Sequence, residues 1–269
     1  MTDTPRMHSG QLGRIAILDL GDAITEHAHP HAHVLIKLGG PDGSFQVAGK
    51  HYPICDDALL AINPWVLHSG ARRMHPAATR VLALYLNAHG ADVARGLPAR
   101  RTFFGRVLYR MDKDVKSLAN RLHRLMTDGQ ATSGAVDDLL RAVQSAHGVD
   151  PSRMPASPRV DYRVRRAIEK MTADPLLAQD LTRCACIAGL SRSHFFALFR
   201  QSTGVSPRLF CNALRLEAAI DRLRDTRTPI GSVADCLGFR APGHFTRFLL
   251  RHVGSTPRAL RASFCGIDS

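Results

Sequence analysis

Two segments in the C-terminal part of this 269-residue chain follow the same plan, and past a central turn they align at an offset of fifty residues. The identical residues at this offset include Phe195 and Phe245, Gly204 and Gly254, Pro207 and Pro257, and Arg208 and Arg258. An internal repeat of this kind rarely arises by chance, and it requires that the two segments fold alike. The chain is therefore predicted to contain one structural unit in two copies.

Each copy carries apolar residues at helical spacing on both sides of a glycine. Before that glycine, the apolar residues of the two copies are Leu181, Cys184, Ala185 and Ala188, and Ile230, Val233, Ala234 and Leu237. Gly189 and Gly238 can supply a left-handed turn, and the small Ala185 and Ala234 let two helices cross closely. The pattern predicts two helix-turn-helix units, whose second helices would present their N-terminal ends to the major groove of DNA.

The segment between the two units is predicted to be a single helix from Pro207 to Arg224. At ~1.5 Å per residue it is roughly 27 Å long, which suits two recognition helices about one DNA turn (~34 Å) apart. Ser191 is a good N-cap for the first recognition helix, and Pro242 suits the first turn of the second. Both recognition helices could then enter successive major grooves on one face of the duplex.

At these residues the sequence resembles the AraC/XylS family of transcription regulators, over about residues 160–264. The second unit, IGSVADCLGFRAPGHFTRFLLRHVGSTPRALR, follows that family's pattern of I-x-x-[IV]-A-x-x-x-G-F, an F-[ST]-R triplet, G-x-[ST]-P and a closing Arg. The resemblance implies double-stranded promoter DNA as a partner, and RNA polymerase as another if the protein is an activator. It also implies an effector-sensing domain in front of the repeat.

The family's DNA-contacting positions can be carried over residue by residue. They fall on Arg192, Ser193, Phe196, Ala197, Arg200, Gly243, Thr246, Arg247 and Arg251. None of the base-facing residues of the first unit is Arg, Gln or Asn, so we expect weak direct readout there, helped by groove shape and thymine methyl groups. Arg247 is the expected base contact, whereas Arg200 and Arg251 are expected on phosphates. For each arginine the alternative is a solvated or salt-bridged surface charge.

The distribution of charge agrees with an anionic partner. Lys and Arg outnumber Asp and Glu by 36 to 23, and the predicted pI is about 10.3. From Arg159 onwards there are 18 basic residues, 17 of them Arg, against 9 acidic ones. Arginine suits bidentate contact with phosphates and guanine edges. The C-terminal part is therefore the expected nucleic-acid-binding part.

The N-terminal part reads as β-structure with a histidine cluster. Between residues 12 and 87, short Val/Ile/Leu-rich runs alternate with Gly/Pro turns, which predicts an antiparallel sandwich or small barrel. The spacing Gly21-x5-His27-x-His29-x3-His33-x6-Gly40 resembles the first cupin motif. The stretch from Asp57 to His68 resembles the second, although Asp56 stands where glycine is usual. The resemblance implies a cupin-like barrel.

The four histidines of these motifs are the candidate effector site. His27, His29 and His33 share strand parity and should point into the barrel, with His68 approaching from a neighbouring strand. Neutral imidazoles converging in this way could hold Zn, Ni, Fe or Mn. They could equally bind an organic effector or one another, and no cofactor is certain. His31, beside Pro30, is expected to be exposed.

The parts of the chain between the barrel and the repeat give the domain plan. Residues 112–147 predict two amphipathic helices in a hairpin, whose apolar stripe could pack on the barrel or form a homodimer interface. The Pro- and Ser-rich stretch GVDPSRMPASP that follows cannot continue a helix. We expect an α+β protein with a cupin-like antiparallel β-barrel at residues 1–110, a helical hairpin at 111–148, a linker at 149–158 and an all-α double helix-turn-helix domain at 159–269.

The predicted function is sequence-specific, DNA-binding transcription regulation controlled by a small effector in the barrel, without catalytic residues. One alternative is a metal-dependent cupin enzyme, such as a dioxygenase or isomerase, with a DNA-binding appendage; another is a constitutive architectural DNA binder. The first residues lack the layout of a signal peptide, and no apolar run approaches the roughly 18 residues that span a bilayer. We therefore expect a cytoplasmic protein with no membrane partner.

Overall fold

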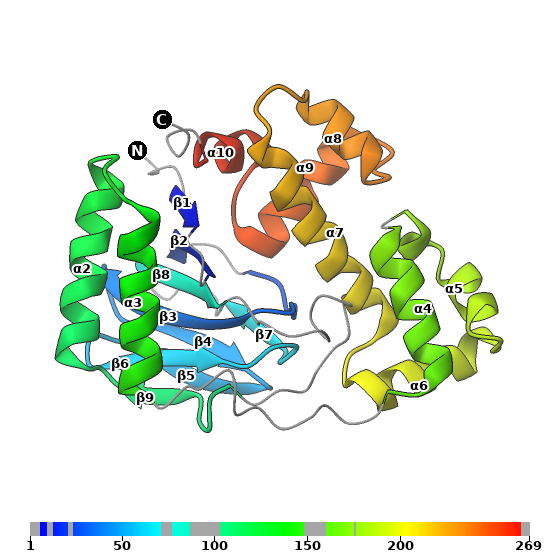
Figure 1. Cartoon of the computed structure of the whole chain (residues 1–269), viewed down its shortest axis with the longest axis horizontal. Coiled ribbons are helices and arrows are strands. Elements are labelled where there is room, and N and C mark those ends of the chain that lie inside the picture. The colour runs from blue at the N-terminus through cyan, green and yellow to red at the C-terminus, as the bar shows by residue number, and fades with distance from the viewer. Residues whose placement is uncertain are drawn as a thin grey trace.

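The computed structural model describes residues 6–9, 13–20, 24–70, 77–86, 103–147, 160–174 and 176–264. Strands dominate the N-terminal part, a helical hairpin follows, and the described residues from 160 onwards form helices and the turns between them (Figure 1). The predicted α+β class, with a β-rich first part and a helical last part, is confirmed. The predicted linker at residues 149–158 lies outside the described residues.

The N-terminal part contains two antiparallel sheets. One has six strands in the order β1 (Arg6–Ser9), β2 (Gly13–Leu20), β8 (Thr79–Leu86), β3 (Ala32–Gly39), β6 (Ala58–Ile62) and β9 (Leu108–Arg110). The other has the order β5 (Lys50–Ile54), β4 (Gly43–Val47) and β7 (His68–Gly70). Apolar side chains from both sheets, among them Leu35, Phe45 and Val81, meet in one core cluster. The two packed sheets occupy the place of the predicted barrel.

The turn between β4 and β5 shows how local sequence fixes the register. Val47 pairs with Lys50, so only Ala48 and Gly49 form the loop. Both loop residues have positive φ, 50° and 79°. Two-residue hairpin loops adopt this backbone because its twist matches that of the flanking strands. Gly49 takes the conformation without strain, and the Ala48 amide donates to the Leu67 carbonyl at 2.8 Å.

The predicted hairpin forms α2 (Lys113–Thr127) and α3 (Ser133–Ala146), capped by the Asp112 and Thr132 side chains. Their apolar stripes are buried and share one core cluster with the six-stranded sheet. The buried residues of the stripes are Val115, Ala119, Leu122, Met126, Val136, Leu139, Leu140 and Val143. Of the two predicted roles of the stripe, packing on the sheet is the one observed within this chain. A homodimer stays a prediction and would have to use other surfaces.

The C-terminal part consists of short helices around one long helix. They are α4 (Tyr162–Ala173), η2 (Leu177–Gln179), α5 (Leu181–Ile187), α6 (Arg192–Thr203), α7 (Pro207–Arg224), α8 (Ile230–Cys236), α9 (Pro242–Val253) and α10 (Pro257–Ala262). The long helix α7, with the predicted bounds, runs between α4–α6 on one side and α8–α10 on the other (Figure 1). Among the described residues, no helix is both long and apolar enough to cross a membrane.

The repeat predicted from the sequence is present in the structure. Phe195 and Phe245 are both fully buried. Helices α6 and α9 both end at a glycine in the left-handed conformation, with φ of 82° at Gly204 and 66° at Gly254. Prolines 207 and 257 then begin α7 and α10. The pairs α5–α6 and α8–α9 are therefore two copies of one unit.

The two parts of the chain are in direct contact. Met7 and Ala16, from β1 and β2, belong to the same core cluster as residues of α7, α8 and α9. Near the start of α7, Trp65 of the N-terminal part stacks on Phe210 with ring centroids 5.0 Å apart. The Met7 amide also donates to the Ser263 carbonyl. The helical part thus lies against one end of the sheets, with α7 at the contact.

Candidate DNA interface and histidine cavity

Each helix-turn-helix unit positions its second helix by a turn and a buried aromatic core. In the first unit, Gly189 has a φ of 66°, and the Ser191 hydroxyl accepts from the His194 amide, so Ser191 is the predicted N-cap. In the second, Gly238 has a φ of 69°, and Pro242 stands at the start of α9. Because the aromatic faces of α6 and α9 point inward, their opposite faces are left to solvent.

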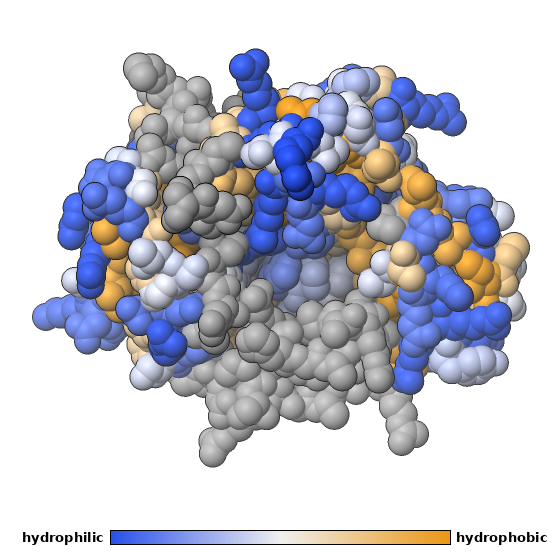
Figure 2. Space-filling model, turned by 45° about the horizontal axis from the view of Figure 1, so that its top comes forward, coloured by the Kyte–Doolittle hydropathy of each residue, from blue (hydrophilic) through white to orange (hydrophobic). Residues whose placement is uncertain are grey.

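Most of the DNA-contacting residues expected from the sequence lie on those exposed faces. The exposed ones are Arg192, Ser193, Ala197, Arg200, Gly243, Arg247 and Arg251. Phe196 and Thr246 are half-buried, and the Thr246 hydroxyl donates to the Pro242 carbonyl at 3.2 Å. Figure 2 shows hydrophilic side chains interspersed with hydrophobic ones on the visible face of the C-terminal helices. Among these exposed residues of α9 there is also an apolar one, Leu250, which is 43% exposed.

The arginines of this surface differ in whether their guanidinium groups contact other residues of the chain. Arg192 donates to the Thr182 hydroxyl at 2.9 Å, and its guanidinium lies 5.5 Å from the Phe196 ring. No described residue forms an ion pair or a side-chain hydrogen bond with the guanidinium groups of Arg200, Arg247 and Arg251. These three side chains are thus available to an external anion, which is what DNA contact requires.

The second unit is held against the rest of the helical part by residues that sequence reasoning missed. Gln179 and Arg215 both donate to the Leu237 carbonyl, at 3.0 and 3.1 Å. The Arg215 guanidinium also lies 3.9 Å from the Phe239 ring centroid. Gln179 lies before the first unit and Arg215 on α7, so these contacts fix the turn of the second unit relative to the first.

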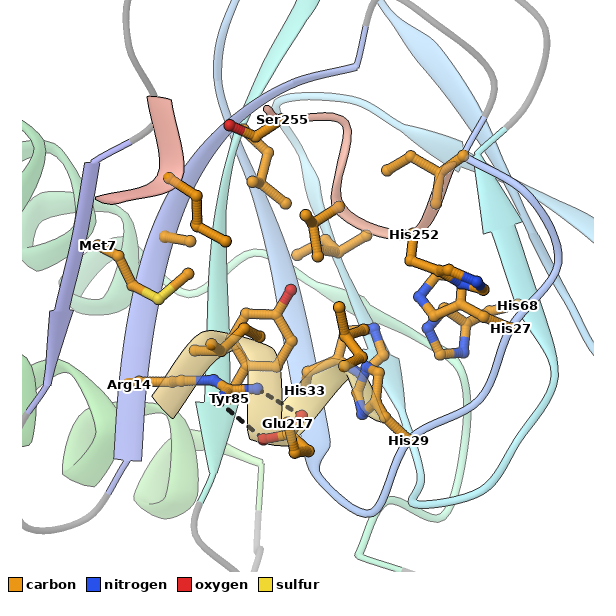
Figure 3. Close-up of a pocket in the computed structure, with 18 of the residues that line it drawn as sticks. Met7, Arg14, His27, His29, His33, His68, Tyr85, Glu217, His252 and Ser255 are labelled. Atoms are coloured by element: carbon orange, nitrogen blue, oxygen red, sulfur yellow. Dashed lines mark hydrogen bonds and ion pairs between the residues drawn. The ribbon is translucent and has the colours of Figure 1, made fainter. Parts of the chain in front are cut away.

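The four histidines predicted as an effector site come together at the end of the sheets that faces the helical part (Figure 3). His27 and His68 bridge through their backbones, with both N to O distances 2.9 Å. Their ring centroids are 4.2 Å apart, and those of His29 and His33 are 4.6 Å apart. Ligand nitrogens of His27, His29 and His68 all lie within 4.8 Å of one another.

Burial makes these imidazoles neutral bases. It lowers the pKa of His29, His33 and His68 well below the usual value, and the neighbouring imidazoles lower the pKa of each ring further. A neutral imidazole keeps one nitrogen lone pair, which is the form that binds a metal ion. At neutral pH the cluster is therefore a set of Lewis bases rather than a set of repelling cations.

Hydrogen bonds orient two of the rings. Nδ1 of His27 donates to the Thr25 carbonyl at 2.8 Å, and Nδ1 of His68 donates to the Val66 carbonyl at 2.7 Å. Because a carbonyl can only accept, Nδ1 carries the proton in both rings and Nε2 is left as a base. His68 Nε2 is buried and has no hydrogen-bond partner among the described residues, and the same holds for Nδ1 of His29 and His33. This arrangement is typical of metal-binding histidines.

Helices α7 and α9 cover the cluster and enclose a cavity of about 50 Å³, called here the histidine cavity. The four histidines line it together with Tyr85, Glu217 of α7 and His252 of α9 (Figure 3). Glu217 and His252 were not predicted as site residues. They come from the other part of the chain, and no local sequence pattern links them to the barrel motifs.

Glu217 is the ionic centre of the contact between the two parts. Both carboxylate oxygens accept from Arg14, at 2.8 and 3.0 Å, and Oε2 also lies 3.0 Å from His31 Nε2. Burial by itself raises the pKa of Glu217, but Arg14 and His31 outweigh it and hold that pKa well below its ordinary value. The expectation that His31 is exposed is wrong: its side chain is 17% exposed, because α7 packs over it.

Comparison with known proteins identifies the helical part. Residues 184–263 match a family described as "Helix-turn-helix domain". NphR, a transcriptional activator of Rhodococcus sp, is 34% identical over 107 residues, which are 40% of this chain and 31% of NphR. RclR, a transcriptional activator of Escherichia coli, is 29% identical over 99 residues, 37% of this chain and 35% of RclR. The chain thus matches about a third of the length of these two relatives.

Two other proteins are similar over nearly the whole chain. YobQ of Bacillus subtilis, described as an uncharacterized HTH-type transcriptional regulator, is 25% identical over 242 residues, 87% of this chain and 88% of YobQ. The structure of ToxT from Vibrio cholerae with an unsaturated fatty acid bound has a TM-score of 0.56 and 14% identity, covering 97% of this chain and 99% of ToxT. The likeness to ToxT concerns the fold, which joins an N-terminal β-rich part to a helical part.

Proposed function

We propose that this chain, whose C-terminal part is a helix-turn-helix domain of the AraC type, is a sequence-specific transcription regulator controlled by an effector in the histidine cavity. The two copies of the helix-turn-helix unit support the first half of the proposal, which is sequence-specific DNA binding. Helices α6 and α9 present exposed faces from two copies of one fold, and Arg200, Arg247 and Arg251 stand free on them. Such a surface suits two segments of major groove together with the phosphates beside them.

The position of the histidine cavity supports the second half of the proposal, which is control by an effector. Its walls come from the sheets on one side and from α7 and α9 on the other. An occupant would therefore contact both parts of the chain at once. A ligand changes the balance between two arrangements only if it binds one of them more tightly. An occupant that touches both parts meets this condition whenever the parts move relative to each other.

The chemistry of the cavity favours a divalent metal ion over a larger organic effector. Small-molecule pockets usually have volumes of about 300–1,000 Å³, whereas this cavity has about 50 Å³. Buried nitrogens without hydrogen-bond partners, such as His68 Nε2, lose free energy unless an ion or water satisfies them. His27, His29 and His68 would be the ligands, and Zn, Ni, Fe and Mn are the candidates. An organic effector such as the fatty acid bound to ToxT would require the two parts to separate.

The same cluster is also compatible with the alternative of a metal-dependent enzyme. A substrate would have to reach a small cavity that α7 and α9 cover, whereas an ion needs little space. We therefore favour regulation. Incubation of the Fe²⁺- or Mn²⁺-loaded protein with small acids and sugars tests the enzyme directly, and turnover of any of them would support it.

Selection of duplexes from a random-sequence pool tests DNA recognition and requires no known operator. We expect enrichment of a motif with two parts whose centres lie about 10 base pairs apart, because α6 and α9 should enter successive major grooves. The part read by α9 should be the better defined, since the base-facing positions of α6 hold no Arg, Gln or Asn. Recovery of no motif would contradict the proposal. RNA polymerase as a partner, a homodimer and a cytoplasmic location are further parts of the proposal.

Thermal unfolding with and without added divalent metals tests the effector site. A ligand bound only by the native state must raise its stability, by ~2.7 kcal/mol at a concentration of 100 Kd. We expect Zn²⁺ or Ni²⁺ to raise the Tm of the metal-free chain and to leave a His29→Phe, His68→Phe variant unchanged. If the metal raises the Tm of the natural chain and of the variant equally, the ion binds outside the histidine cavity.

A further inference from the structure

We propose that His252 of α9 binds the same metal ion as His27, His29 and His68, so that the ion ties the second recognition helix to the sensing part. The inference rests on the metal site proposed above and adds a ligand from the DNA-binding part. His252 stands in the last turn of α9 and lines the histidine cavity. Figure 3 shows it reaching from α9 to the same place as His27 and His68.

The distances between the rings fit a shared ion. With metal–nitrogen bonds of about 2.0–2.1 Å, the centres of two imidazole rings on one ion lie roughly 4 to 6.5 Å apart. The ring centroids of His27 and His252 are 6.1 Å apart, and those of His29 and His68 are 5.0 Å apart. The ring of His252 thus lies within this range of His27, at its outer end, whereas the ligand nitrogens that lie within 4.8 Å of one another are those of His27, His29 and His68.

The surroundings of His252 leave its imidazole free to coordinate. Burial, together with the nearby His27 and Arg251, lowers its pKa to about 4. It packs on Phe248 with ring centroids 4.5 Å apart. Among the described residues, none is hydrogen-bonded to its ring nitrogens. The contact with Phe248 therefore holds the ring beside the cluster without occupying its lone pair.

The backbone already joins the end of α9 to the loop that carries the cluster. The Arg251 carbonyl accepts from the Thr25 amide at 3.0 Å and from the Thr25 hydroxyl at 2.8 Å. The Thr25 carbonyl in turn accepts from His27 Nδ1. Thr25 thus places His27 and His252 side by side from opposite parts of the chain. Binding an ion between them needs side-chain movement and no separation of domains.

A second pocket adjoins the histidine cavity at this point. It has a volume of about 230 Å³ and shares His27 and His252 with the histidine cavity. Its other polar lining residues are Glu26, Ser206, Arg208 and Asn212, so oxygen ligands and one positive charge face this pocket.

Metal affinity of the full-length chain tests the inference, with Co²⁺ as the probe because its visible spectrum reports its ligands. His252→Phe keeps an aromatic ring packed against Phe248 and removes the nitrogens. We expect it to bind Co²⁺ at least tenfold more weakly than the natural chain and with an altered spectrum. The matched control is His244→Phe, an exposed position on the same helix, which should keep the natural affinity and spectrum. Natural affinity and spectrum in His252→Phe would overturn the inference.

Hydrogen exchange of the natural chain gives a second test that depends on no variant. Zn²⁺ should slow exchange of amides in the last turns of α9 as well as in β7, because the ion would join the two. Protection of β7 without α9 would overturn the inference and leave the sensing site intact. No Zn²⁺ or Co²⁺ binding at all would overturn both the metal site and the inference, whereas duplex selection tests the DNA-binding function independently.

Discussion

Replacement of Glu217 with leucine is expected to loosen the contact between the two parts of the chain. Glu217 pairs through both carboxylate oxygens with Arg14, and the side chains are only 20% and 10% exposed. Leucine removes the charge of Glu217 but leaves the Arg14 guanidinium buried without its counter-ion. Removal of one partner from a fully buried pair typically costs ~3–5 kcal/mol. With partial exposure and solvent screening, we expect about 2–3 kcal/mol here.

A free-energy change of this size is large enough to shift the equilibrium between the docked and the separated parts of the chain measurably. Each ~1.4 kcal/mol is a factor of ten, so the balance between separated and docked parts should change roughly 30- to 150-fold. Trp65, the single tryptophan of the chain, reports this balance because it is 7% exposed and stacks on Phe210 across the contact. In a urea titration, the red shift of Trp65 emission should begin at lower urea in Glu217→Leu than in the natural chain.

A double variant separates the charge effect from lost packing. In Arg14→Met, Glu217→Leu no buried charge is left unpaired, and apolar side chains of similar size fill the space. Most of the lost stability should therefore return, as a coupling energy in the double-mutant cycle. If Glu217→Leu leaves the urea dependence of Trp65 emission unchanged, the ion pair does not hold the two parts together. The same conclusion follows if the double variant is as unstable as Glu217→Leu alone.

Three further predictions concern the DNA-binding part. Arg247→Ala should reduce the discrimination at one base pair by ~1–3 kcal/mol, whereas Arg251→Ala should lower the affinity for all duplexes alike and reduce the slope of log affinity against log salt by about one. If Arg247→Ala loses the same affinity for operator and for unrelated DNA, Arg247 is a phosphate ligand. The affinity of the natural chain for DNA should fall steeply between low and moderate salt in gel-shift assays, and a nearly constant affinity would count against phosphate neutralisation. Residues 159–269 alone should fold, as circular dichroism would show, and bind the operator; an unfolded fragment would refute the domain boundary.

The features that can be predicted from the sequence are local or periodic. The pairs Phe195 and Phe245, and Gly204 and Gly254, are visible as a repeat, and each does the same structural task in both copies. The histidine cluster is visible as a spacing, since His27, His29 and His33 lie close together in the chain. Short-range patterns of this kind depend on helix and strand geometry alone and are independent of tertiary contacts.

The features that cannot be predicted from the sequence depend on contacts between distant segments. Glu217 lies 203 residues from Arg14, and no periodicity joins them. The place of His31 beside Pro30 predicts an exposed side chain, but α7 covers it. The stripe of the helical hairpin could have packed on a sheet or on a second chain, since both bury the same side chains. His252 reads as a polar residue at a helix end, and only its position beside His27 makes it a candidate ligand.

The affinity of the full-length chain for a selected duplex, measured with and without Zn²⁺, tests most directly whether the histidine cavity controls DNA recognition. The natural chain should bind the selected duplex at least ~10³-fold more tightly than unrelated DNA at physiological salt. Zn²⁺ should change the affinity for the selected duplex at least tenfold, and the His29→Phe, His68→Phe variant should show no such change. Equal affinity for both duplexes would contradict the assignment as a sequence-specific regulator. Specific binding that is the same with and without Zn²⁺, in a chain that binds the ion, would contradict control through the cavity.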